Sequence, residues 1–100
     1  MKQELIEKNH SILEHHGMLN QITIWIEEMS ELTKELCKLQ RYFRENGTAC
    51  MPFLLLNNIK LETTDVQICL DQIKEAINYS IEQQEMDYEY KVDREIERMK

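Results

Sequence analysis

Two pairs of carboxylates, each spaced three residues apart, are the part of this sequence best suited to chemistry. Glu28 and Glu31 form the first pair, and Glu62 and Asp65 form the second. On an α-helix, residues three apart are neighbours on one face, so each pair can direct its carboxylates at one point. Carboxylate oxygens without a nearby His or Cys favour Mg²⁺ or Mn²⁺ over zinc. These four residues are therefore candidate ligands of a divalent cation.

A solvated acidic face is the more common meaning of such a pair. E-x-x-E and E-x-x-D occur on many helices, and neither pattern alone indicates a metal. Glu62, however, falls inside an apolar stripe, between Ile59 and Val66. A buried carboxylate without a partner is costly, and a cation would remove that cost. On the residues alone, a metal site and a solvated acidic face are both open.

Helices must position these carboxylates, because the apolar residues around them recur at steps of three and four. The expected helices span residues 2–16, 18–45, 53–79 and 83–99. The chain has only two Gly and one Pro, so it is poor in the residues that make turns between strands. The pattern predicts one all-α domain over 1–100, an antiparallel helical bundle of about four helices. The last, highly charged segment is expected to dock on a neighbour or to fray.

The helix expected over 18–45 carries a broad apolar face beside its acidic residues. One part of this face comprises Ile22, Ile26, Met29, Thr33 and Leu36, and a flank comprises Trp25, Leu32, Leu39 and Phe43. Glu28, Glu31 and Glu35 lie directly beside that flank, whereas Glu27 lies further toward solvent. The acidic motif is therefore expected at the edge of a packing surface.

Composition and charge exclude several classes of protein. The formal net charge of −7 repels a polyphosphate backbone, so nucleic acid is not an expected partner. The N-terminus is too charged for a signal peptide, and no apolar run approaches the ~18 residues that cross a bilayer. The three Cys are widely spaced and suggest reduced thiols rather than a disulfide framework. We expect a cytoplasmic protein without a membrane partner, whose small core is completed by dimerisation.

The two acidic motifs and their flanks resemble a known family. "IEEMSELTKELCK", followed by "LETTDVQICLDQIKEAI", is similar to the MazG-like all-α nucleoside triphosphate pyrophosphohydrolases. Their pattern is E-E-x-x-E on one helix and E-x-x-D on the next. The charged ending "YEYKVDREIERMK" also looks like the last helix of small members, so the resemblance covers about residues 18–99.

The resemblance implies a Mg²⁺-dependent hydrolysis of (deoxy)nucleoside triphosphates to the monophosphate and pyrophosphate, with Mn²⁺ as a substitute. It implies metal binding by Glu28, Glu31, Glu62 and Asp65. Glu28 and Glu31 are also the candidates for the general base, with Glu35 less favoured. A homodimer or homotetramer is expected, in which a partner subunit completes the pocket.

This sequence departs from the family pattern at a few positions. Leu61 stands where members usually carry a second acidic residue, and Thr63 and Thr64 replace small aliphatic residues. The connection from Glu31 to Glu62 is also rather long. The four main ligand positions survive, so the departures bear on the substrate more than on the chemistry.

Four further residues are candidates for substrate binding, each with a plainer alternative. Lys38 and Arg41 could reach phosphate oxygens or be solvated cations near a helix C-terminus. Trp25 could stack on a base and Gln21 could read a base edge, or they could serve in the core and on the surface. The competing function is a catalytically silent helical interaction module that retains the acidic face. A decoy that mimics nucleic acid has only the net charge in its favour.

Overall fold

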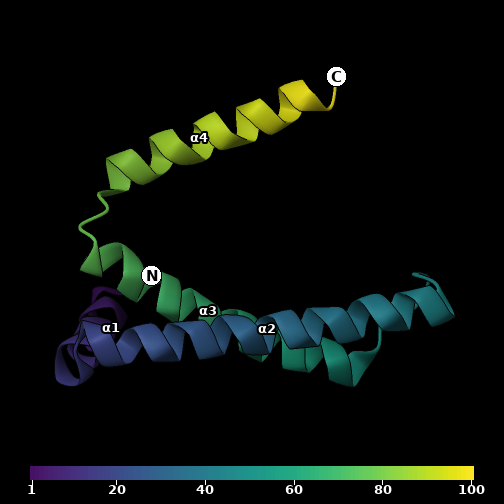
Figure 1. The fold of residues 1–100 in the computed structure, drawn as a ribbon, viewed down its shortest axis with the longest axis horizontal. Helices are drawn as coiled ribbons and strands as arrows, with labels where there is room; N and C mark the ends of the chain where they lie inside the picture. Colours follow the sequence, from purple (N-terminus) through teal and green to yellow (C-terminus); the bar gives the residue numbers. More distant parts are fainter.

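The computed structural model describes residues 1–100, which form four helices and no strands (Figure 1). In chain order they are α1 (Gln3–His16), α2 (Met18–Asn46), α3 (Phe53–Ala76) and α4 (Ile81–Arg98). The prediction of an all-α chain with about four helices is confirmed. None of the helices combines the length and the apolar composition needed to span a bilayer.

Two glycines mark the ends of α1 and α2. Gly17 and Gly47 have φ angles of 79° and 76°, a region that side chains with a Cβ rarely adopt. The amide of Gly17 donates to the carbonyl of Leu13 at 2.9 Å, and that of Gly47 to Phe43 at 2.8 Å. Each glycine thus satisfies a carbonyl of the last helical turn while the chain changes direction.

The antiparallel pair of α2 and α3, the α2–α3 hairpin, forms the most extensive helix packing in the molecule. α2 has 29 residues, which corresponds to a length of about 43 Å. α3 returns beside it in the opposite direction, and α1 packs against both at one end (Figure 1). The α2 face toward α3 carries Trp25, Glu28, Leu32 and Glu35, all at least partly buried and three or four residues apart. This spacing turns the first acidic motif toward α3.

The core lies where α1, α2 and α3 meet. Leu13, Trp25 and Cys69, one from each helix, form its centre, and Ile73 and Ala76 pack against them. Only 6 of the 100 residues are buried, which is a small core for a chain of this length. Within one chain, therefore, much apolar surface stays in contact with solvent.

α4 is a regular helix that stands apart from the other three. It makes no packing contact with α1, α2 or α3 and extends away from the hairpin (Figure 1). The Ser80 hydroxyl caps it by accepting a hydrogen bond from the Gln83 amide at 3.2 Å. The radius of gyration is 16.9 Å, against about 13 Å for a compact domain of this length. In this chain the last helix is formed but docked on no neighbour.

Candidate metal centre

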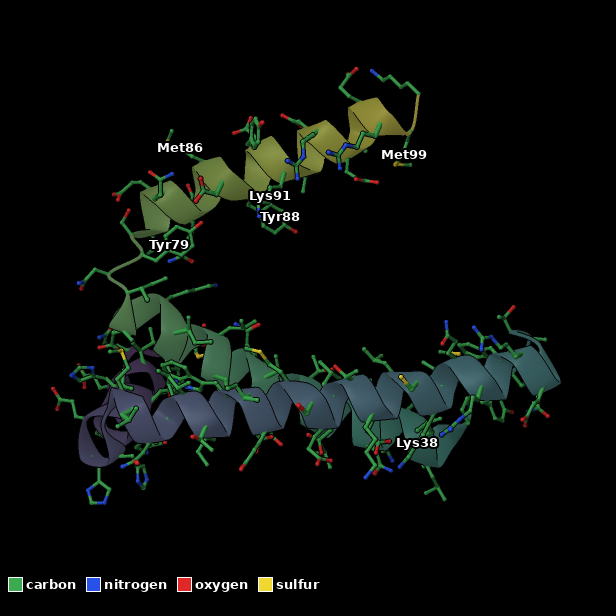
Figure 2. All side chains as sticks on the ribbon, in the orientation of Figure 1. Lys38, Tyr79, Met86, Tyr88, Lys91 and Met99 are labelled. Atoms are coloured by element: carbon green, nitrogen blue, oxygen red, sulfur yellow. The ribbon has the colours of Figure 1, made fainter.

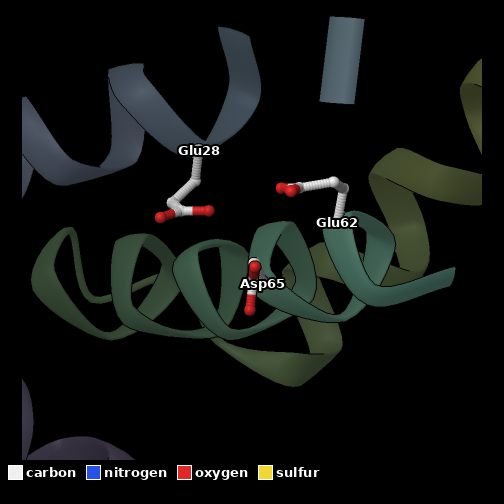
Figure 3. A group of neighbouring side chains, drawn as sticks. All are labelled: Glu28, Glu62 and Asp65. Carbon is white, nitrogen blue, oxygen red and sulfur yellow. The ribbon is translucent and has the colours of Figure 1, made fainter. Parts of the chain in front are cut away.

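Three carboxylates from the two acidic motifs meet between α2 and α3. Glu28 of α2 and Glu62 and Asp65 of α3 each offer an oxygen, and these oxygens lie within 4.8 Å of one another. Figure 3 shows the Glu28 side chain pointing from α2 toward α3, and the Glu62 carboxylate pointing back toward Glu28. Residues distant in sequence thus converge because the hairpin brings the two motifs to the same level.

Loss of hydration and the closeness of these carboxylates raise the pKa values of Glu28 and Glu62. Loss of hydration raises the pKa of Glu28 above its ordinary range, and the charges of Asp65, Glu62 and Glu31 raise it further. Loss of hydration likewise raises the pKa of Glu62, with contributions from Asp65, Glu31 and Glu35. Like charges held together oppose ionisation, so this cluster favours a proton or a cation among its oxygens.

One oxygen of the cluster has no partner within the protein. Oε2 of Glu62 is buried and accepts no hydrogen bond, which is costly for an ionised carboxylate. Mg²⁺ prefers carboxylate oxygens and tolerates a site completed by water and phosphate. The donor set of Glu28, Glu62 and Asp65 therefore fits a hard divalent cation, and the unpartnered oxygen is available to it.

The fourth predicted ligand, Glu31, lies outside this three-residue group. Its side chain is exposed, but its charge helps to raise the pKa of both Glu28 and Glu62. The structure thus brings three of the four predicted ligands together and leaves Glu31 at the solvent side.

Glu35 is more deeply placed than Glu31. It is 8% exposed, and one carboxylate oxygen accepts a hydrogen bond from Lys38 Nζ at 3.0 Å. The other oxygen is buried and unpartnered. The charge of Glu35 contributes to the raised pKa of Glu62, so Glu35 extends the acidic cluster along α2. The ammonium group of Lys38 lies at the edge of this cluster.

Gln21 and Trp25 lie on the buried side of α2, before the acidic motif. The Gln21 amide and the Trp25 indole N–H both donate to Oε1 of Gln72, at 2.9 and 2.8 Å. Gln72 in turn donates to Oδ1 of Asn9 at 2.7 Å, which ties α1 to the same point. For Gln21 or Trp25 to contact a base, Gln72 would have to release it.

Arg41 is exposed on α2, one turn beyond Lys38. This position leaves its guanidinium free to meet a phosphate that approaches from solvent. Together with Lys38 it gives the C-terminal half of α2 a positive side, in contrast to the acidic motif that precedes it.

Gln72 was not among the residues that the sequence indicated, although it organises the junction of three helices. It is 2% exposed, and both ends of its amide are used. A signal was present: Gln72 follows Cys69 by three residues on the inward face of α3. A glutamine at such a position predicts a buried polar network.

Comparisons of the chain with protein-family models, curated proteins and solved structures found no match. The MazG-like resemblance therefore rests on the residues of the two motifs and their flanks.

Proposed function

We propose that this protein is a Mg²⁺-dependent nucleotide pyrophosphohydrolase, which converts a (deoxy)nucleoside triphosphate to the monophosphate and pyrophosphate. The observation that carries the proposal is the convergence of Glu28, Glu62 and Asp65 from two helices within 4.8 Å. The raised pKa values of Glu28 and Glu62 add support, because perturbed carboxylates gather at functional sites more often than elsewhere.

The residues divide into three roles in this proposal. Glu28, Glu62 and Asp65 hold the cation, and Glu31 joins them from the solvent side. A bound Mg²⁺ supplies neutralisation of the phosphate charge and orients the triphosphate for in-line attack by water. Glu28 or Glu31 positions that water and takes its proton.

Lys38 and Arg41 are assigned to bind oxygens of the phosphates that leave as pyrophosphate. In the free protein Lys38 is held by Glu35 at 3.0 Å. A triphosphate carries more negative charge than one carboxylate, so we expect Lys38 to exchange Glu35 for a phosphate oxygen. Trp25 and Gln21, one and two turns before Glu28, are assigned to the wall of the base pocket. The same proposal includes a cytoplasmic setting and a homodimer or homotetramer in which four-helix bundles are completed between chains.

Pyrophosphate release from a panel of dNTPs and NTPs with Mg²⁺ tests the activity. We expect release with at least one base, and a loss of ~100-fold or more in a Glu62→Gln, Asp65→Asn double variant. Glu27→Gln is the matched control, because Glu27 lies on the same helix but is exposed and outside the cluster. No release with any nucleotide, or full release by the double variant, would contradict the proposal.

A catalytically silent interaction module is the second candidate. It is favoured by the exposed apolar side chains of α4, which no part of the chain covers. The nucleotide panel separates the two, since a silent module releases no pyrophosphate with any nucleotide.

A further inference from the structure

One face of α4 carries an apolar stripe that runs along the whole helix. The stripe comprises Ile81, Tyr88, Val92, Ile96 and Met99, at steps of seven, four, four and three residues. All five side chains are exposed, between 44% and 74%. Steps of this kind keep residues on one helical face. Figure 2 shows Tyr88 on the side of α4 toward the hairpin and Met86 on the opposite side.

A second bare apolar surface lies on α2. Ile22, Ile26 and Leu36 are 39%, 61% and 47% exposed, because only the neighbouring flank with Trp25 and Leu32 packs against α3. A hollow of about 250 Å³ continues this surface, lined by Thr33, Leu36, Cys37 and Gln40. We call this surface the open flank of α2. It is long enough to receive a helix of the length of α4.

The elbow between α3 and α4 is held by contacts of Tyr79 with the first turns of α4. The Tyr79 hydroxyl donates to the Asp87 carboxylate, and the Gln84 amide donates to the Tyr79 carbonyl at 2.7 Å. Asn78 adopts a positive φ of 55°, which turns the chain at this point. These contacts fix the direction in which α4 leaves the hairpin, and the apolar stripe stays uncovered.

One chain exposes more surface than a compact monomer of its mass, and the excess is comparable to the area that a homodimer buries. The accessible surface is 8220 Å², whereas a compact monomer of 12.1 kDa exposes about 6,000 Å². The excess of roughly 2,200 Å² per chain lies in the range that obligate homodimers bury. Mutual docking of two α4 helices would use this excess symmetrically, each chain covering the other.

Charge along the two helices is complementary in an antiparallel alignment. The first half of α4 is acidic beside the stripe, at Glu82, Glu85 and Glu89, and the exposed Arg41 and Arg44 lie beside the open flank near the end of α2. Antiparallel docking sets these groups against each other. A parallel alignment would instead set acid against acid.

We propose that α4 is an exchanged arm: its apolar stripe docks antiparallel on the open flank of α2 in a second copy of this chain. The juxtaposition of an uncovered stripe, an uncovered flank and matching charge carries the inference. It does not depend on hydrolysis, and it specifies how two chains assemble.

Light scattering of the full chain after size exclusion tests the proposal. We expect the wild type to have twice the 12.1 kDa mass of one chain. A Val92→Gln, Ile96→Gln variant should be monomeric, whereas the control Met86→Gln, Tyr90→Gln should stay dimeric. The two pairs share the i,i+4 spacing, but Met86 and Tyr90 lie on the opposite face of α4. Glutamine adds no charge and is a good helix former.

A charge exchange tests the partner surface without altering the apolar stripe. Arg41→Glu, Arg44→Glu in one chain and Glu85→Arg, Glu89→Arg in another should each weaken self-association at least tenfold. An equal mixture of the two variants should restore a dimer, because each α4 then meets an α2 of opposite charge. A monomeric wild type, a dimer that survives the Val92, Ile96 variant, or a mixture that stays monomeric would overturn the proposal.

Discussion

Glu28 and Glu62 are side chains whose ionisation opposes folding when no cation is bound. Their pKa values are raised in the folded chain, so folding favours their protonated forms. The stabilising effect is present at pH values below the ordinary carboxyl range and is lost as pH rises through the raised pKa values. We therefore expect the melting temperature in a chelator to fall as pH rises above the ordinary carboxyl range.

A Glu62→Gln variant should flatten this fall, because it removes one of the repelling charges and keeps the size of the side chain. Glu27→Gln should leave it unchanged. Thermal melting of the three proteins over the pH series makes the comparison. An identical pH dependence in wild type and Glu62→Gln would contradict the electrostatic account of the cluster.

His10 gives a second pH dependence, at the contact between α1 and α3. Partial burial alone would lower the pKa of His10, but Glu14 and Glu75 outweigh it and raise the pKa. His10 Nε2 lies 2.8 Å from Glu14, and Nδ1 faces Glu75 of α3. The charged pair stabilises α1 below the ordinary His range and is lost as pH rises through the raised value. We expect His10→Gln to lower the melting temperature at pH ~6 more than at pH ~9.

Among the helices, the junction of α1, α2 and α3 depends on Gln72. Gln72→Leu leaves the Trp25 and Gln21 donors without an acceptor in a buried place, at a cost of about 1–3 kcal/mol for each unsatisfied group. We expect the melting temperature to fall by roughly 5 °C or more. The control Gln67→Leu, five residues earlier and exposed, should change it little. Equal melting of Gln72→Leu and wild type would show that the network contributes nothing.

The helices themselves were predictable, because they follow from local patterns. Steps of three and four, two glycines and one proline define the four segments within a few residues. The approach of Glu28 to Glu62 also follows from sequence once α2 and α3 form a hairpin. The solvent-side position of Glu31 does not, because it depends on the rotation of α2 against α3, which packing decides.

Two features were beyond the sequence for the same reason. Ile22 and Ile26 belong to a broad apolar face, yet α3 covers only its neighbouring flank. The separation of α4 depends on the elbow, where Tyr79 and Asn78 carry no periodic signal. Both features depend on tertiary packing: on which flank of α2 packs against α3, and on whether α4 has a surface to pack on. The periodicity of a single helix determines neither.

For the whole molecule, the small core together with the proposed exchange of α4 predicts that stability depends on association. Only 6 of 100 residues are buried, so under the proposed exchange of α4 contact between chains supplies much of the hydrophobic stabilisation. We expect the melting temperature to rise with protein concentration, by several degrees over a hundredfold range. Calorimetry at two concentrations measures this. A melting temperature independent of concentration would mean that the single chain is stable without a partner.

The candidate metal centre is the feature on which the functional account depends. Calorimetric titration of the apo protein with Mn²⁺ measures it without any substrate. The account predicts saturable binding at one site or more per chain, weakened at least tenfold by Asp65→Asn and by Glu62→Gln and unchanged by Glu27→Gln. Absence of saturable binding, or equal binding by all four proteins, would show that the convergent carboxylates are only a solvated acidic surface.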